Sequence, residues 1–402
     1  MVLGCAVCQT GLGFAYGMSG LAPDILAEFG WSRALYASGQ APQGWLIALA
    51  SPLAGFGVAR FGGRRVLSLA AIVMAVAYAT LAGMQSWWQL ALGWSLVGLG
   101  VAGLGDIVTG AVVTQWVRRD RGLLLGLVYT GSNLGGYVAS RGMAAIADAH
   151  SWRHAVATVA SVSLCVLLPA AWFAVRDRSG GAPAPELPSE APLDVDDENS
   201  LDAATALRTR SFWILAAGLF GFWIYLYAVL VHFVLALVDA GLERATAVGY
   251  FANAVLMGLF SKVVFGFVAD RLRPKASLLL DYGLLALSSV FLVWVPGARP
   301  ELIWAFVGLF GFSYAARDVV TPLICVHCFG AKNLAQIYGL LMLTILPGSS
   351  LGPVLPGFVF DRTGSYELAF LGLAATNGLT LLLLCAVRDE RRAAPKLPGA
   401  PA

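Results

Sequence analysis

Charge is the scarcest ingredient of this sequence. Only 12% of its 402 residues are charged, whereas 58% are hydrophobic. Average soluble domains carry about 25% charged residues, because their surfaces face water. So few polar side chains cannot cover a soluble fold of this length. The composition therefore excludes an ordinary soluble enzyme and indicates a chain whose solvent is a lipid bilayer.

Histidine and cysteine are scarce as well. The four histidines are spread over separate segments, which argues against a membrane metalloenzyme with clustered ligands. Cys5-x-x-Cys8 and Cys325-x-His327-Cys328 look like metal half-sites, but they lie in apolar runs rather than on the turns that shape zinc sites. We interpret the cysteines as small packing residues and expect no metal and no cofactor.

Basic residues are absent before Arg33, and the first apolar run begins at Met1. A cleavable signal peptide opens with basic residues and ends at a small-residue cleavage site. We therefore expect no cleavable signal and expect the first helix to stay in the protein.

Apolar runs of about 20 residues are what the sequence has in abundance, and this length crosses a bilayer as a helix. They predict an all-α membrane protein with twelve transmembrane helices. The expected spans are 2–22, 36–59, 66–83, 88–112, 123–146, 152–175, 211–238, 246–268, 276–296, 300–323, 336–359 and 366–387.

One long polar stretch interrupts this series. Residues 176–210 combine several prolines with Asp and Glu, and such a segment cannot bury a core. We expect it to be a flexible cytoplasmic linker between an N-terminal six-helix half (1–175) and a C-terminal six-helix half (211–387). Residues 388–402 would form a cytoplasmic tail.

Orientation follows from Lys and Arg in the loops, which concentrate on the cytoplasmic side of membrane proteins. Most of them fall on the side that holds the linker, so both termini are expected in the cytoplasm of a bacterium, with the chain in its inner membrane. The opposite side holds only Arg33, Arg153, Arg244, Arg299 and Arg362.

A loop pattern recurs every three helices. Its copies are 55–65 after the second span, 266–275 after the eighth and 357–364 after the eleventh, with a degenerate copy at 142–153. Such recurrence is typical of three-helix units repeated four times, the arrangement of many transporters.

These loops resemble the signature of the major facilitator superfamily. Further segments are similar to the bacterial branch of its monocarboxylate porter family: 11–16, 28–33, 116–122, Gly131-Ser132, 231–233 and 352–366. The resemblance implies the major facilitator fold. It also implies a gating role for Gly55, Arg60, Arg64, Gly266, Asp270 and Arg271.

The chain departs from the family in four places. Ala59 replaces the loop Asp of the first copy, and the first helix lacks the lysine that animal members carry. Lys262 stands where members usually place an arginine, so the charge is kept and the two-pronged fork for a carboxylate is lost. Gly258 stands where an acid or amide is common.

Ionisable side chains inside spans cost free energy, so by default they face a cavity and act there. If all faced one cavity, three bases and two acids would leave one net positive charge with histidine neutral, which suits a monoanion. The candidates are Asp106, Arg141, His232, Lys262, Arg317 and Asp318.

We expect Arg317 and Lys262 to neutralise a substrate carboxylate. Asn133, Tyr137 and Arg141 share one helix face at i, i+4 and i+8, and we expect that face to line the cavity. Each has a structural alternative: the stripe can instead bond a neighbouring helix, and Arg317 can bind a fixed carboxylate.

Four further residues are open between two roles. Tyr314 shapes the pocket or only packs. Asp318 carries a proton or pairs with Lys262. Asp106 carries a proton or pairs with an arginine of the first loop copy in a gate. His232 binds substrate or a proton, or is a packing histidine.

The sequence thus predicts a secondary transporter, not an enzyme. Its expected substrate is a small, monocarboxylate-like organic anion, moved with protons by alternating access. The alternatives are an organic-anion exchanger or an efflux pump for larger amphipathic compounds; a receptor would bring a soluble domain, and none is evident. The expected partners are the substrate, protons and the bilayer, with no nucleic acid, and the chain is expected to be a monomer.

Overall fold

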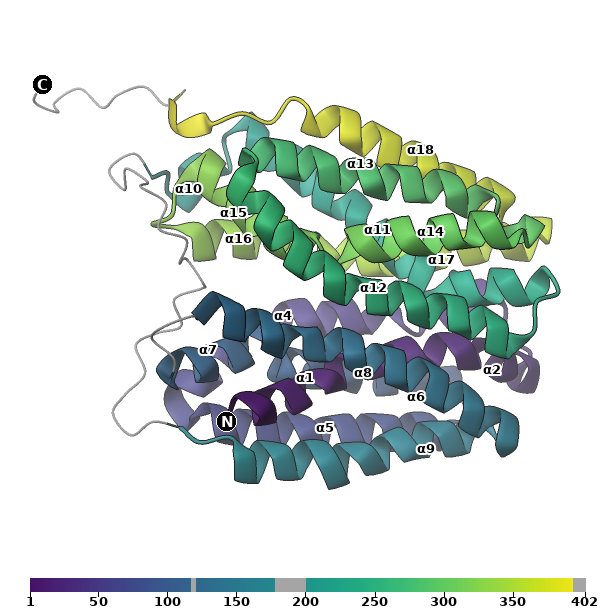
Figure 1. Ribbon diagram of the computed structural model, residues 1–402. Coiled ribbons are helices and arrows are strands. Elements are labelled where there is room, and N and C mark those ends of the chain that lie inside the picture. The colour runs from purple at the N-terminus through teal and green to yellow at the C-terminus, as the bar shows by residue number, and fades with distance from the viewer. Residues whose placement is uncertain (117–120, 178–199, 393–402) are drawn as a thin grey trace, which may run out of the picture.

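The regular structure is helical throughout the part of the chain that the structure describes, with no strand there (Figure 1). This computed structural model describes residues 1–116, 121–177 and 200–392, without the side chains of 121–123, 269–270 and 392. Helices satisfy every backbone group internally, which a lipid environment demands. The all-α membrane fold is therefore confirmed.

The helices form two bundles (Figure 1). The first holds α1 (Val2–Gly17), η1 (Met18–Leu21), α2 (Ala22–Phe29), α3 (Arg33–Ser38), α4 (Ala41–Phe61), α5 (Gly63–Ala82), α6 (Trp87–Leu104), α7 (Asp106–Trp116), α8 (Arg121–Ala149), α9 (Trp152–Val162), η2 (Ser163–Leu167) and η3 (Ala170–Ala174). The second holds α10 (Ala203–Ala206), α11 (Arg210–Asp239), α12 (Arg244–Arg271), α13 (Pro274–Val293), η5 (Val295–Gly297), α14 (Pro300–Tyr314), α15 (Arg317–Phe329), α16 (Leu334–Met342), α17 (Ile345–Thr363), α18 (Glu367–Leu384) and η6 (Glu390–Arg392).

Within the described residues, 9 helices are long and apolar enough to cross a membrane, or 10 if the bent pair α14–α15 counts as one span. The helices α3 and α4 join in one such span, as do α6 with α7 and α16 with α17. The helix α8 and the broken segment α1–α2 are not among them. The count of twelve therefore stays a prediction, although every expected run is helical.

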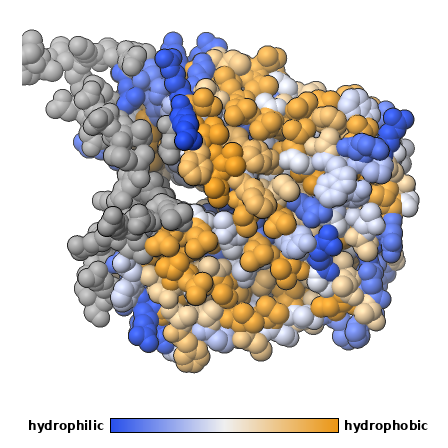
Figure 2. Space-filling model, viewed as in Figure 1, coloured by the Kyte–Doolittle hydropathy of each residue, from blue (hydrophilic) through white to orange (hydrophobic). Residues whose placement is uncertain are grey.

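The lateral surface of the bundles is apolar. Leu53 of α4 and Leu382 of α18 are each 70% exposed, which water would penalise and lipid does not. Figure 2 shows orange apolar residues along the flank and blue polar residues toward the two ends. The chain is a multi-pass membrane protein.

The last residues of the predicted linker pack against the second bundle. The backbone N–H of Leu201 donates to Phe329 O at 2.8 Å, and Asp202 caps α10 by accepting from the N–H of Thr205 at 2.8 Å. Ala206 is fully buried. This segment finds backbone partners at the end of α15, which sequence pattern does not reveal; residues 178–199 of the linker lie outside the described part.

The two ends of the molecule differ. We call the end that carries Arg176–Asp177 and Ser200–Arg210 the linker end, and the other the far end (Figure 1). Contacts between the bundles join α8 to α12, and α17 to both α3 and α4. The hydrogen bonds and ion pairs between the bundles, among the described residues, lie at the far end and in the middle.

Glycine allows α1 and α8 to pack closely. A Cβ added to Gly13 would lie 2.1 Å from the backbone nitrogen of Gly136, and one on Gly135 would lie 2.2 Å from Thr10 O. Helices in lipid gain their association from such close contacts, since apolar area alone favours no partner over lipid.

Replacing Gly13 with valine should therefore force α1 and α8 apart. We expect a loss of about 1–3 kcal/mol of stability, the usual effect of overpacking, seen as a lower melting temperature of purified protein. Gly142→Val is the matched control on α8, because nothing lies within 4 Å of a Cβ there. Equal melting temperatures for the two variants would contradict the packing.

Candidate functional site

The spans that carry Asp106, Arg317 and Asp318 are broken near their middles. Gly105 separates α6 from α7, and Ala315–Ala316 separate α14 from α15 at an angle of 44°. Asp106 is the first residue of α7, and Arg317 and Asp318 are the first two of α15. Both breaks bring a helix N-terminus, the positive end of the helix dipole, to the interior of the molecule.

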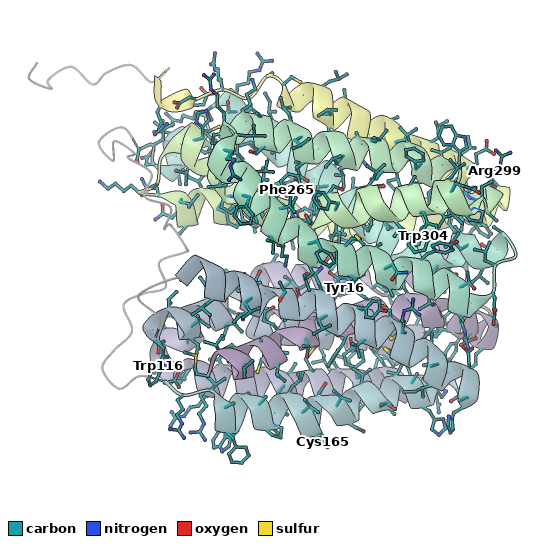
Figure 3. All side chains as sticks on the ribbon, in the orientation of Figure 1. Tyr16, Trp116, Cys165, Phe265, Arg299 and Trp304 are labelled. Carbon is teal, nitrogen blue, oxygen red and sulfur yellow. The ribbon has the colours of Figure 1, made fainter. Side chains whose placement is uncertain are left out.

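A cavity of about 230 Å³ lies between the bundles, lined by residues of both. Its charged residues are Asp106, Lys262, Arg317 and Asp318, and its aromatic wall includes Trp223. Figure 3 places Tyr16, another lining residue, where the two bundles meet. Breaks in two spans and residues far apart in sequence thus form one site.

Asp318 is bound by both cations of the cavity. Arg317 donates to its carboxylate, and the Lys262 ammonium lies 3.4 Å from the other carboxylate oxygen. The guanidinium of Arg317 also stacks over the rings of Trp223 and Phe222, with its carbon 4.5 and 5.1 Å from the ring centres. Neighbouring residues on a helix need not pair, but here both side chains line the cavity.

Asp106 has a different environment. Its carboxylate accepts from the Gln9 amide at 2.9 Å, and the same amide nitrogen lies 2.8 Å from the Thr109 hydroxyl. The side chain is exposed to the cavity, and no cation pairs with it among the described residues. The expected alternative, a pair with Arg60 or Arg64, is not present.

Asn133 and Tyr314 join the bundles beside the cavity. The Asn133 amide nitrogen donates to the Tyr314 hydroxyl at 2.6 Å and to Val255 O at 2.9 Å. The Asn133 amide oxygen is buried and has no hydrogen-bond partner in the described chain. Both residues line the cavity.

Three residues that the sequence singled out lie outside the cavity. Arg141 is exposed and packs over Tyr137, 5.4 Å from the ring centre. His232 is fully buried, between Tyr366 and α17. A stripe on one helix face can meet a neighbouring helix as well as a cavity, and Arg141 lies against α12 at Gly249. The charge sum changes as a result: two cations and two carboxylates give the cavity a net charge of zero.

Contacts at the far end connect the bundles. Arg33 pairs with Asp239 at 2.6 Å, and the Asp361 carboxylate accepts from the backbone nitrogens of Arg33 and Ala34, each at 2.9 Å. Asp361 belongs to the third copy of the repeated loop, so that copy closes this end.

A second far-end cluster is built on Arg244 of α12. It forms ion pairs with Asp24 of α2 and with Asp148 of the degenerate loop copy. Next to it, Arg153 holds Glu28 at 2.6 Å, and this hydrogen bond lowers the pKa of the Glu28 carboxyl. Sequence reasoning missed both clusters; the scarcity of basic residues on that side was the available signal.

The residues for which the resemblance implies a gating role lie at the linker end, and the ring contacts of their described arginines stay within one bundle. Arg60 and Arg271 are exposed beside rings of their own helices, and Arg64 lies over Trp172 of the same bundle. Gly55 packs near Ile107, and Gly266 has open space around it. The side chain of Asp270 lies outside the described residues.

Other residues were overlooked by sequence reasoning. Gln9 and Trp223 lie in apolar runs and read as packing until a charged neighbour is seen. Asp281 of α13 is a buried carboxylate, 3% exposed, within a span that the sequence treated as apolar. The signal in the sequence was an acidic residue within an apolar span.

Comparisons with known proteins agree with this architecture. Residues 3–317 match the family Major Facilitator Superfamily. The chain is 26% identical to human (Homo sapiens) monocarboxylate transporter 11, over 89% of this chain and 77% of the relative. It is 23% identical to the hexuronate transporter of Bacillus subtilis (strain 168), over 82% of this chain and 81% of the relative.

Solved structures share the fold. A point mutant of the nucleoside transporter NupG superposes with a TM-score of 0.76 at 11% identity, covering 96% of this chain and 99% of that one. A bacterial homologue of the human lysosomal transporter Spinster, in an inward-facing and unoccupied conformation, has a TM-score of 0.69 at 16% identity, covering 96% and 94%.

Proposed function

This chain belongs to the Major Facilitator Superfamily and is a transporter, not an enzyme, and we propose that it carries a small organic anion bearing one carboxylate together with a proton. The observation that carries the proposal is the cavity lined by two cations and two carboxylates, with Asp106, Arg317 and Asp318 at the broken spans and Lys262 on α12. The relatives named for monocarboxylates and for hexuronate, which is also a carboxylate, are consistent with it.

The charge balance predicts the coupling. A carboxylate entering the cavity would bring its net charge to −1, and an unbalanced charge away from water is costly. One proton taken up with each carboxylate restores neutrality. A neutral cavity therefore favours symport of one anion with one proton over movement of the anion alone.

We assign the substrate carboxylate to Arg317 and Lys262. Their present partner is Asp318, so the substrate competes with that carboxylate for the same cations. The N-terminus of α15 adds a favourable dipole at this position. Asn133, with its free amide oxygen, would accept a hydrogen bond from a hydroxyl or amine elsewhere on the substrate.

We assign the proton to Asp106. Asp318 has two cations beside it, whereas Asp106 accepts only from the neutral Gln9 amide among the described residues. A carboxylate with a neutral donor and access to the cavity can gain a proton without breaking an ion pair. Asp318 is the second candidate for the proton, if the substrate displaces it from both cations.

Alternating access would use the contrast between the two ends. The far end is closed by Arg33 and Arg244, and the two bundles would rock around the cavity to open it. The excess of Lys and Arg at the linker end favours placing that end in the cytoplasm, with the chain in a bacterial inner membrane. A single chain contains both bundles and the whole cavity, so we propose a monomer.

Uptake into proteoliposomes with a trapped pH dye tests the proposal. Lactate and glucuronate should each enter with about one proton per anion, while neutral lactamide should cause no pH change; protein-free vesicles correct for passive entry. An exchanger would move labelled anion only against internal anion and without acidification. Entry of amphipathic compounds alone would instead favour the efflux pump.

A further inference from the structure

Arg33 ties α3 to three elements of the other bundle. Besides its ion pair with Asp239 at the end of α11, its guanidinium carbon lies 3.7 Å from the ring centre of Phe360 in α17. It also donates to the hydroxyl of Tyr366, just before α18. A single side chain of one bundle thus holds the far end of the other.

Tyr366 also contacts His232, a residue that does not line the substrate cavity. The imidazole Nδ1 lies 2.9 Å from the Tyr366 hydroxyl, and Nε2 lies 2.6 Å from the backbone oxygen of Pro353. His232 is fully buried and Tyr366 is 2% exposed, so neither has water as a ready substitute partner.

The chemistry of donors and acceptors fixes the direction of each hydrogen bond in the series that runs from Arg33 through Tyr366 and His232 to Pro353. A carbonyl oxygen can only accept, so Nε2 of His232 carries the hydrogen and donates to Pro353 O. In a neutral ring the other nitrogen then accepts, and it receives the hydroxyl hydrogen of Tyr366. The Tyr366 oxygen remains free to accept from Arg33. The closed far end is therefore built around a neutral His232.

A second proton on His232 disrupts this series of hydrogen bonds. With both ring nitrogens carrying hydrogen, Nδ1 no longer accepts, so the hydroxyl hydrogen of Tyr366 loses its acceptor. The imidazolium also adds a positive charge near Arg33. Since buried polar groups without partners are costly, the protonated ring favours the conformation in which these residues separate and meet water.

Other charged side chains lie around Arg33, Tyr366 and His232, and they contribute to the electrostatic environment of the imidazole. Asp239 on α11 and Asp361 on α17 face Arg33 directly. Arg244 of α12 pairs with Asp24 of α2 beside them, and Glu367 opens α18. Asp239 is paired with Arg33, Asp24 and Asp148 are paired with Arg244, and Asp361 accepts from backbone N–H groups. The carboxylates outnumber the cations, so the release of the far end rests on the hydrogen-bond mismatch at Nδ1 and not on charge repulsion.

We propose that His232 is a proton-binding site outside the substrate cavity, and that a proton bound there releases the closure of the far end. The proposal rests on the alternating access of the proposed function but not on the identity of the substrate. A ligand that binds one conformation better shifts the population toward it, and here the ligand is the proton. Acid on the far-end side would then favour the state that is open to that side.

Distances between the two bundles at the far end test this directly. Spin labels at Gln85 and Arg299, both exposed, report the separation in nanodiscs without substrate, after the exposed Cys165 and Cys385 are changed to serine. Between pH 8 and pH 5.5 we expect the ratio of closed to open molecules to fall about tenfold, within the limit for one proton over this range.

Two variants assign the effect. His232→Gln keeps a donor for Pro353 O and does not titrate, so its far end should stay closed at both pH values. Tyr366→Phe keeps the ring contacts of residue 366 with Phe360 and Phe370 but loses the hydroxyl. The far end of this variant should therefore be partly open already at pH 8, and its opening should respond less to pH. His154→Gln is the matched control, because this histidine also lies at the far end but is hydrogen-bonded to Ser151 and not to Tyr366 or His232.

The outcomes are distinct. A pH response in His232→Gln equal to that of the parent, a loss of response in His154→Gln, or no response in the parent would each overturn the proposal. Because no substrate is present, failure to transport carboxylates would leave this result untouched. Conversely, an absent pH response of the far end would leave carboxylate uptake standing.

Discussion

Arg317→Gln should lower carboxylate uptake by about tenfold to a hundredfold while the protein stays folded. The expected loss is that of a hydrogen bond to a charged group, about 1.5–3 kcal/mol, with each 1.4 kcal/mol worth about a factor of ten. Stability should change little, because Asp318 keeps Lys262 as its partner at 3.4 Å. Uptake in proteoliposomes and melting of the purified protein measure the two effects.

The same variants separate a binding role from a structural one. If Arg317 only held Asp318, breaking the pair would cost about 3–5 kcal/mol of stability, and Arg317→Gln with Asp318→Asn would restore it. Added carboxylate should stabilise the parent protein and not Arg317→Gln. Arg141→Gln is the matched control, since this exposed arginine lies outside the cavity and should leave uptake unchanged.

Asp106→Asn should abolish the acceleration of uptake by an inward proton gradient. An amide keeps a hydrogen-bonding group near Gln9, whose side-chain amide now donates to Asp106 at 2.9 Å, but it cannot gain or lose a proton. The cavity then carries one net positive charge at all pH values, so carboxylate binding should no longer improve as pH falls. Exchange of labelled for unlabelled carboxylate should persist, because exchange moves no net proton.

Asp106→Glu serves as the control, because it retains a titrating carboxyl and should keep gradient-driven uptake in part. Uptake by Asp106→Asn that still accelerates with the gradient as in the parent protein would move the proton to Asp318. The assay is initial uptake of labelled lactate at equal internal and external pH, compared with an external pH lower by about two units.

Some parts of the site could be predicted from sequence and others could not. Arg317, Lys262, Asp106 and Asp318 were identifiable because a charge within an apolar span is costly and implies a cavity or a partner. The pair of Lys262 with Asp318 was one of two alternatives that the sequence left open. The pair of Arg317 with Asp318 was not expected, because adjacent helical residues normally diverge by about 100°, and the bend of 44° between α14 and α15 has no proline or glycine at its centre.

Residues without a charge were the harder case. Trp223 and Gln9 look like ordinary packing residues until the structure places Arg317 and Asp106 beside them. The stripe of Tyr137 and Arg141 illustrates the opposite error. One helix face was read correctly from the spacing, but nothing in the spacing says whether that face meets a cavity or α12.

The sequence by itself determined that this protein is a helical, multi-pass membrane protein, because apolar runs of spanning length admit no other backbone in lipid. The Major Facilitator family was indicated separately, by the resemblance of its repeated loops to the family signature. Its repeated loop also pointed to Asp361. Only the tertiary structure decided that Asp361 caps α3, that Arg33 reaches His232 through Tyr366, and that two basic and two acidic side chains share one cavity. These are contacts between residues hundreds of positions apart, and they depend on how the two bundles approach, which local hydrophobicity and charge do not encode.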